Sequence, residues 1–294
     1  MKKNNYTAWL YLLPAILFIG VFLVYPLIDV LIYSLRENYS SLTNASTGVG
    51  FANFGYVLGD TLFIDALRNT LILVFITVPF STVLALAISV GLASIKPLRK
   101  AFQTIYFLPY VTNTIAVGMV FLILFDQNDI TVGFVNGITG VFGAEPVDFI
   151  DGPYWAKMLT LSIYTVWTVL PFKILVLTTA LASVKQDYYN AAKLDGTSRW
   201  RTFYRITLPM ISPSLFYLII TGFIGAFKAY GDAVALFGQD LKLAEMNTIV
   251  GYVYETFHKN SMPSYASAAA IILFLIVLLI TAINLLVSKK KVHY

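Results

Sequence analysis

The 294-residue chain contains no cysteine and only two histidines, His258 and His293, which lie far apart. Without cysteine the chain can form no disulfide, no thiolate metal site and no cysteine nucleophile. Two isolated histidines do not make a zinc site, which needs three or four clustered ligands. We therefore expect neither a metal site nor catalytic residues in this chain.

Charged residues are also scarce, at 12% of the chain, whereas a soluble domain carries about 25%. Hydrophobic residues make up 58%, so the chain cannot cover a water-facing surface and the lipid bilayer is its natural surroundings. The net charge of +5 does not indicate nucleic-acid binding, because the basic residues lie between apolar runs rather than in one patch.

Long charge-free runs predict how often the chain crosses the bilayer. About 20 apolar residues are needed for one crossing. The sequence therefore predicts an all-α membrane protein with six transmembrane helices, over residues 9–35, 69–95, 102–125, 158–183, 212–235 and 265–288. The first run is longer than the apolar part of a secretory signal and no small-residue cleavage site follows, so we expect this helix to be retained.

The predicted helices divide the chain into three parts. Residues 1–68 form an N-terminal transmembrane helix and an outer loop, residues 69–288 form the main membrane domain, and residues 289–294 form a basic tail. An even number of helices places both termini on one side. Most lysines and arginines then fall on that side, while loop 126–157 on the other side is acidic, so the positive-inside rule predicts cytoplasmic termini.

One cytoplasmic connection, residues 185–209, is much longer than the others. Asp187 suits the start of a short helix, and Gly196 can take the left-handed conformation that ends one. Ser198 or Thr197 can cap a second short helix. The simpler alternative is a solvated basic loop that obeys the positive-inside rule.

The second short helix carries three arginines and is expected to end at Pro209. In the first, Ala191 and Ala192 leave a nearly bare surface, which lets another protein approach closely. The loop therefore has the features of a docking segment for a soluble partner.

This segment resembles a signature of the binding-protein-dependent permeases of ABC importers, which reads E-A-A-x-x-x-G, nine residues, then I-x-L-P. Here residues 190–196 read NAAKLDG and residues 206–209 read ITLP, with the same spacing. In that family the segment is the coupling helix that docks in a cleft of the ATPase subunit. The resemblance assigns ATPase docking to the following residues: Asn190, Ala191, Ala192, Asp195, Gly196, Ile206 and Pro209. Asn190 replaces the family's glutamate, which removes one charge from the docking surface.

Four further segments resemble the carbohydrate-uptake branch of this family: residues 66–70, residues 107–109, Trp167 with residues 170–172, and residues 266–269. The resemblance implies a type I ABC importer permease fold in the plasma membrane of a bacterium. It also implies four partners: a second permease, normally forming a heterodimer, an ATPase dimer that uses ATP and Mg, an extracellular solute-binding protein, and a sugar as substrate, preferably an oligosaccharide. The chain itself has no G-x-x-x-x-G-K-[ST] phosphate loop, so we expect no bound cofactor and no enzymatic activity of its own.

Charged and aromatic side chains inside the predicted spans are candidates for a substrate path. A charge at the bilayer centre costs at least about 2.5–3.5 kcal/mol, so Lys173 and Lys228 should face a cavity or a partner. Lys228 and Asp232 lie one helical turn apart and could instead form a structural ion pair. Aromatic rings stack on the apolar faces of sugars, although packing is the more common role of any one ring. The candidates are Tyr164, Trp167, Phe172, Lys173, Phe227, Lys228, Tyr230 and Asp232.

Two other function classes remain open. A self-contained secondary transporter or channel would show inverted internal repeats, which we do not find. A membrane-embedded enzyme would need clustered ionisable groups within the spans. Because of the two lysines, an anionic substrate such as an acidic saccharide or glycerol phosphate remains an alternative to a neutral sugar.

Overall fold

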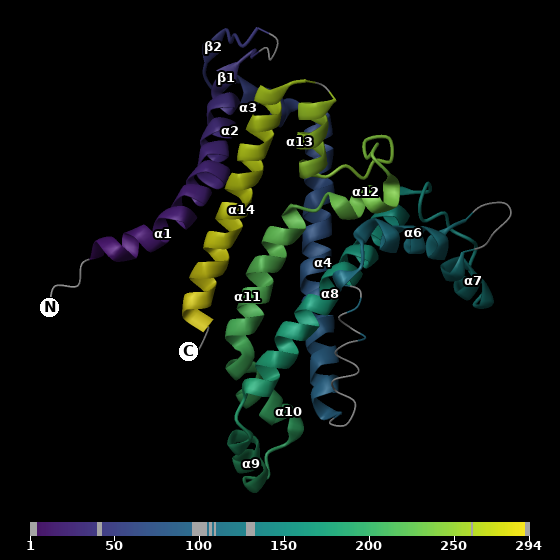
Figure 1. Cartoon of the computed structure of the whole chain (residues 1–294). Helices are drawn as coiled ribbons and strands as arrows, with labels where there is room; N and C mark the ends of the chain where they lie inside the picture. Colours follow the sequence, from purple (N-terminus) through teal and green to yellow (C-terminus); the bar gives the residue numbers. More distant parts are fainter. Residues whose placement is uncertain are drawn as a thin grey trace. The chain divides into compact units, whose positions relative to one another are not determined.

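The computed structural model describes residues 5–39, 43–95, 105, 108, 110–127, 133–259 and 261–291 (Figure 1). The chain forms two compact units. The first consists of Met1–Ile64 and Ile249–Leu275, and the second of Asp65–Thr248 and Ile276–Tyr294. Some expectations fall outside the described residues: positions 107 and 109 of one family-like segment, and residues 292–294 of the tail.

The first unit is built from helices and one short hairpin. Its elements are α1 Asn5–Ile19, the π-helical turn η1 Gly20–Val24, α2 Tyr25–Leu35, the antiparallel pair β1 Arg36–Glu37 and β2 Gly48–Val49, α3 Ala52–Gly59, the start of α4 Thr61–Ser94, α13 Ile249–His258 and the first part of α14 Pro263–Lys291. The phenol of Tyr252 donates to Asp60 Oδ2 at 2.7 Å, and burial, then this contact, raises the pKa of Tyr252. The bond joins α13 to the turn between α3 and α4.

Among its described residues, the second unit holds the remainder of α4 and α14 and seven further helices with defined bounds, with one π-helical turn. These are α6 Thr114–Phe125, α7 Phe134–Val141, α8 Tyr154–Ser183, α9 Gln186–Leu194, α10 Arg199–Thr202, η2 Phe203–Thr207, α11 Leu208–Phe227 and α12 Gly231–Phe237. Helix α12 packs closely on α6 at Gly118, which has no side chain to keep the helices apart. A Cβ at Gly118 would lie only 2.7 Å from the Ala235 carbonyl oxygen. Phe121, Leu161 and Leu236 belong to the core around this contact.

Five helices of the described residues are long and apolar enough to cross a membrane: Trp9–Leu35, Thr61–Ala93, Tyr154–Ser183, Arg199–Phe227 and Pro263–Leu286. The predicted spans over 9–35, 69–95, 158–183 and 265–288 are therefore confirmed, although α4 and α8 begin several residues earlier. The span predicted over 102–125 is described only in part. It is not one continuous helix, because α6 begins at Thr114, where Asn113 Oδ1 accepts from the amides of Ile115 and Ala116.

The fifth predicted helix, 212–235, is wrong at both ends. The chain is continuously helical from Arg199 to Phe227, and α12 is a separate helix. Pro209 does not end the helix, because the π-helical turn η2 precedes it and the Leu208 amide donates to Phe203 O, five residues back. A proline lacks the amide for the usual bond and its ring crowds the carbonyl four residues earlier, which the wider turn relieves. The same arrangement recurs before Pro26, where η1 precedes α2.

Candidate functional site

A cavity of about 360 Å³ lies between α4, α8, α11 and the start of α12, within the second unit. Four of the predicted path residues line it: Lys173, Lys228, Tyr230 and Asp232. Phe172, also a candidate, lines it and stacks on Tyr110 with ring centroids 5.7 Å apart. The cavity therefore combines aromatic faces with charged and hydroxyl side chains inside helices that are otherwise apolar.

Lys173 is buried, at 4% exposed, and joins α8 to α4. Its Nζ donates to Ser81 Oγ at 2.7 Å, Thr82 Oγ1 at 2.9 Å and the Val78 carbonyl at 3.3 Å. All three acceptors are uncharged. Gly222 of α11 leaves room for this contact, since a Cβ there would lie 3.4 Å from Lys173 Nζ and 3.3 Å from Val78 Cγ1.

Two threonines give the cavity unused hydrogen-bonding capacity. The hydroxyl oxygens of Thr77 and Thr165 are buried, and both residues line the cavity. Thr77 has no hydrogen-bond partner among the described residues, whereas the Thr165 hydroxyl lies beside the Asp232 carboxylate. Buried polar atoms are rarely left unpaired, because an unmade bond costs about 1–3 kcal/mol. A hydroxyl-bearing solute in the cavity would pair with Thr77 and share Thr165 with Asp232. We did not select these threonines from the sequence. A sequence signal exists for Thr77, which lies four residues before Ser81 on α4. Residues four apart share one face of a helix, so these two hydroxyls form a polar stripe on an otherwise apolar helix.

Lys228 and Asp232 do not form the pair that a continuous helix would have allowed. Lys228 follows the last residue of α11, and Asp232 lies in the first turn of α12. Neither ion pair found among the described residues joins them. Lys228 is instead a cation at the C-terminus of α11, and Asp232 is an anion at the N-terminus of α12. Each charge has the sign that stabilises its helix end.

Three other candidates do not line this cavity. Tyr164 and Phe227 are fully buried in the core, and the Tyr164 phenol donates to the Thr114 carbonyl at 2.6 Å. Trp167 is 45% exposed and lines a separate hollow of about 350 Å³ beside Phe121 and Leu108. The structure thus brings five of the eight candidates together.

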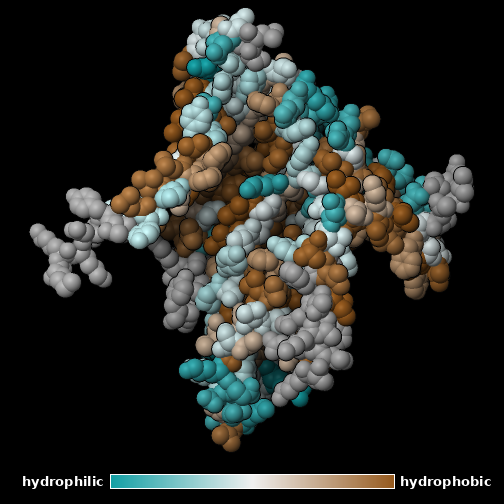
Figure 2. Space-filling view, in the orientation of Figure 1, coloured by the Kyte–Doolittle hydropathy of each residue, from teal (hydrophilic) through white to brown (hydrophobic). Residues whose placement is uncertain are grey.

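The loop 185–209 folds largely as its sequence predicts. Helix α9 spans Gln186–Leu194, Gly196 has φ +65°, and the Thr197 amide donates to the Ala192 carbonyl at 2.9 Å. Ser198 caps α10, because its Oγ accepts from the Arg201 amide at 3.4 Å. In Figure 2 the surface of this segment, the lowest part of the molecule, is largely hydrophilic.

The two halves of the spaced signature meet in this loop. Ala191, Ala192 and Asp195 line one groove of about 540 Å³ together with Ile206. Of the remaining signature residues, Asn190 and Gly196 are exposed and Pro209 is half-buried. The expectation that both alanines leave a bare surface is wrong for Ala192, which is 6% exposed because it turns inward, while Ala191 remains exposed.

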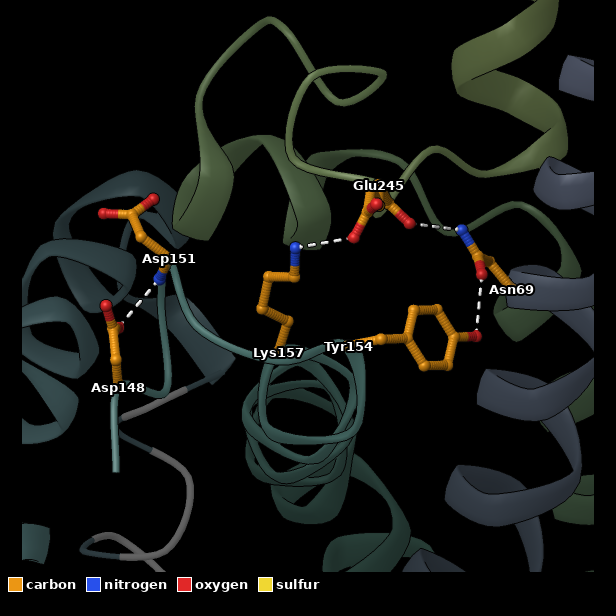
Figure 3. Close-up of polar contacts among 6 residues, drawn as sticks. All are labelled: Asn69, Asp148, Asp151, Tyr154, Lys157 and Glu245. Atoms are coloured by element: carbon orange, nitrogen blue, oxygen red, sulfur yellow. Dashed lines mark hydrogen bonds and ion pairs between the residues drawn. The ribbon is translucent and has the colours of Figure 1, made fainter. Parts of the chain in front are cut away.

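A polar network fastens the opposite end of the second unit (Figure 3). Asn69 Nδ2 donates to the carbonyls of Glu245 and Asn247, each at 2.9 Å, and Asn69 Oδ1 accepts from the Tyr154 phenol at 2.8 Å. Lys157 Nζ contacts Glu245 Oε2 at 3.0 Å. Asn69 belongs to the family-like segment 66–70, so the structure gives that segment a physical role. It ties α4 and α8 to the loop before α13.

Replacing Asn69 by alanine should destabilise the protein more than replacing Tyr154 by phenylalanine. Asn69→Ala removes both bonds to the loop and leaves the Tyr154 hydroxyl unpaired, which should lower the free energy of unfolding by about 2 kcal/mol and the thermal midpoint by roughly 4–8 °C. Tyr154→Phe removes a single bond and should cost about 1 kcal/mol. Thermal unfolding of the two detergent-purified variants measures this. Equal costs would mean that the bonds to Glu245 and Asn247 contribute nothing.

The chain also matches known proteins along most of its length. Residues 83–293 match the model of a family described as binding-protein-dependent transport system inner membrane component. The lactose transport system permease protein of Rhizobium radiobacter is 31% identical over 290 residues, which cover 97% of this chain and 94% of the relative. The arabinooligosaccharides transport system permease protein of Bacillus subtilis is 28% identical over 286 residues, which cover 95% and 88%.

The fold is shared with a solved transporter. A chain in the crystal structure of a bacterial alginate ABC transporter in complex with alginate pentasaccharide-bound periplasmic protein superimposes with a TM-score of 0.84 at 23% sequence identity, covering 99% of this chain and 97% of that one. The resemblance drawn from the spaced signature is therefore confirmed. The protein is a multi-pass membrane permease that belongs to the family of binding-protein-dependent transport system inner membrane components.

Proposed function

We propose that this chain is one permease subunit of an ATP-driven ABC importer that translocates a sugar, preferably an oligosaccharide, delivered by an extracellular binding protein. The observation that carries the proposal is the cavity beside Lys173, where buried threonine hydroxyls, that of Thr77 without a partner among the described residues, occur together with stacked aromatic rings. Sugars present both hydroxyls and apolar ring faces. The names of the lactose and arabinooligosaccharide relatives support the same substrate class.

The hydrogen bonds of Lys173 favour a neutral sugar over an anionic solute. An ammonium group has three N–H donors, and Lys173 already directs three hydrogen bonds at Val78, Ser81 and Thr82. It therefore has none left for a carboxylate or phosphate. The alternative substrates, an acidic saccharide or glycerol phosphate, would depend on Lys228, which is exposed at the cavity.

The proposed membrane arrangement has six transmembrane helices in the plasma membrane of a bacterium, with both termini in the cytoplasm. Residues 69–288 would form the transport domain, with 1–68 as an added helix and outer loop and 289–294 as the basic tail. A second permease, preferably a different chain, would complete the path. The basic loop 185–209 on the cytoplasmic side agrees with the positive-inside rule.

The energy source would be a separate ATPase dimer that binds ATP and Mg and docks on the groove between α9 and α10. Asn190, Ala191, Asp195 and Gly196 are exposed for this contact. Helix α11 continues without interruption from α10 and η2 to the cavity, where Gly222 and Gly225 line the wall. Closure of the ATPase dimer would move the loop, and the continuous helix would transmit that movement to the cavity. Hydrolysis would then reset it.

Uptake of labelled oligosaccharide into vesicles tests the proposal. The complete importer comprises this chain, the second permease, the ATPase and the binding protein. It should accumulate sugar only when ATP is present on the side of the vesicle membrane that carries the ATPase. Uptake driven by an ion gradient without ATP would instead support a secondary transporter. Uptake of glycerol phosphate in preference to sugar would overturn the proposal that the substrate is neutral.

The two buried threonine hydroxyls at the cavity give a sharper test. Thr77→Val and Thr165→Val should each raise KM for the sugar by roughly fivefold, because each would remove one neutral hydrogen bond to the substrate. Thr160→Val is the matched control, since Thr160 lies on the same helix as Thr165 but bonds the carbonyls of Phe149 and Ala156 away from the cavity. An equal KM in all three variants would contradict a substrate contact at the cavity.

A further inference from the structure

Helix α7 has its polar and apolar faces reversed relative to a helix that meets water. Asn136 is 2% exposed and turns inward, where its Nδ2 donates to Val147 O at 2.8 Å and to Gln127 Oε1 at 3.0 Å. Its Oδ1 accepts from the Val147 amide at 3.0 Å. A surface helix normally turns its polar side chains outward. Here the polar side chain serves the interior of the unit.

The outward face of α7 is made of large apolar side chains. Phe134 is 64% exposed, Ile138 46% and Val141 82%, and Phe142 directly after the helix is 85% exposed. Positions 134, 138 and 141 lie on one side of a helix because they are four and three residues apart. In Figure 2, hydrophobic surface gathers where Figure 1 draws α7.

This face offers nothing but apolar contact. Residues 133–144 contain no charged side chain, and the two other outward positions on the helix are Gly137 and Gly140, where an added Cβ would touch nothing. A protein–protein interface carries about one hydrogen bond per 100–200 Å², and the outward face of α7 has no side-chain donor or acceptor for one. Hydrocarbon chains, by contrast, require none.

The neighbouring helix α6 also carries outward apolar side chains. Helix α6 precedes α7 in the chain and contacts it. On α6, Met119 is 59% exposed and Ile123 is 73% exposed, and α6 is one of the apolar helices of this multi-pass protein. Val135 of α7 packs on the core cluster that contains Phe121 and Phe125 of α6. The outward apolar residues of the two helices are thus held in one rigid part of the unit.

We propose that α7 is an interfacial helix, whose outward face of Phe134, Ile138, Val141 and Phe142 lies in the bilayer at the boundary between headgroups and acyl chains. Such helices bury their apolar face about 5–10 Å into that boundary. In the orientation proposed above this is the outer leaflet. The helix anchors the α6–α8 connection to lipid, and the absence of basic residues means that it requires no anionic headgroup.

The absence of native cysteine allows a direct test with single-cysteine spin labels in the assembled importer, reconstituted in phosphatidylcholine vesicles. Labels would be placed by Ile138→Cys and Val141→Cys. Ile123→Cys, at a 73% exposed position on the apolar helix α6, is the apolar reference. Leu243→Cys, at an 83% exposed position in the loop before α13, is the water-facing reference.

The measured quantity is the ratio of the label's collision rate with oxygen to its collision rate with a water-soluble nickel chelate. At positions 138 and 141 this ratio should resemble that at position 123 and be at least about threefold higher than that at position 243. Two results would overturn the proposal. Labels that follow position 243 would place α7 in water. Labels shielded from both reagents would place α7 under a protein, such as the second permease or another copy of this chain. Because the readout is depth and not transport, it is independent of which solute is carried.

Discussion

Replacing Gly196 by valine should lower ATP-driven uptake by about tenfold or more. Gly196 has φ +65° directly after α9, a conformation that costs a side-chain-bearing residue about 1–2 kcal/mol and a β-branched residue most. Relief of that strain would break the bond from the Thr197 amide to the Ala192 carbonyl, which closes the turn between α9 and α10. The groove shared by Ala192 and Ile206 would then lose its shape. Uptake and co-purification of the ATPase measure the effect.

Gly196→Asn is the matched control, because asparagine adopts the left-handed conformation more readily than other side-chain-bearing residues. A Cβ at Gly196 would touch nothing within 4 Å, so neither substitution creates a clash. The asparagine variant should retain most of its uptake and its ATPase. If valine and asparagine behave alike, the backbone conformation at this position does not control docking. If the ATPase binds the valine variant normally, the proposed docking site is wrong.

Replacing Lys173 by glutamate should be the most damaging single change in the cavity. Nζ of Lys173 is surrounded by Val78 O, Ser81 Oγ and Thr82 Oγ1, and both hydroxyls already donate to carbonyls of their own helix. A carboxylate there would be buried without a donor, which costs roughly 3–5 kcal/mol. That is a large share of the stability of a folded protein. The yield of monodisperse protein and its thermal midpoint in detergent measure the loss.

Lys228→Glu provides the matched comparison, since it makes the same charge change at the same cavity. Lys228 is exposed and forms no ion pair among the described residues, so its replacement should change the free energy of unfolding by less than about 0.5 kcal/mol. Similar losses for the two variants would show that the cavity responds to net charge alone. A large loss for Lys173→Glu together with a small loss for Lys228→Glu would instead identify Lys173 as the residue that holds α8 against α4.

The features that sequence reasoning predicted are those with local signals. Long apolar runs marked four of the crossing helices, and Gly196 and Ser198 marked the ends of α9 and α10. The apolar runs act over about 20 residues and the helix-end residues over one helical turn, and neither signal depends on packing against other segments of the chain. The sequence also predicts that the short helix carrying the arginines ends at Pro209. The structure instead continues this helix past Pro209, since the π-helical turn before Pro209 removes the clash that would have ended it.

The features that sequence reasoning missed depend on tertiary packing. The charge-free run ends at Phe227, where the structure also ends α11, but the predicted span continues through Lys228 and Asp232 to residue 235. The short α12 instead packs on α6, which Gly118 permits by leaving space beside Ala235. In the same way, residue type alone could not distinguish Tyr164, which lies in the core, from Tyr230, which lines the cavity.

The burial of Lys173 has a consequence for the energy stored across the membrane. A bacterial membrane holds ion gradients, and any hydrated path for a solute is a potential leak. Lys173 and Lys228 against Asp232 leave the cavity with one excess positive charge. A cation about 4 Å from Lys173 Nζ would be repelled by about 4 kcal/mol at an effective dielectric constant of about 20, whereas an uncharged sugar would not. In the proposed path, the ammonium that fastens α8 to α4 also keeps protons and sodium ions from following the sugar.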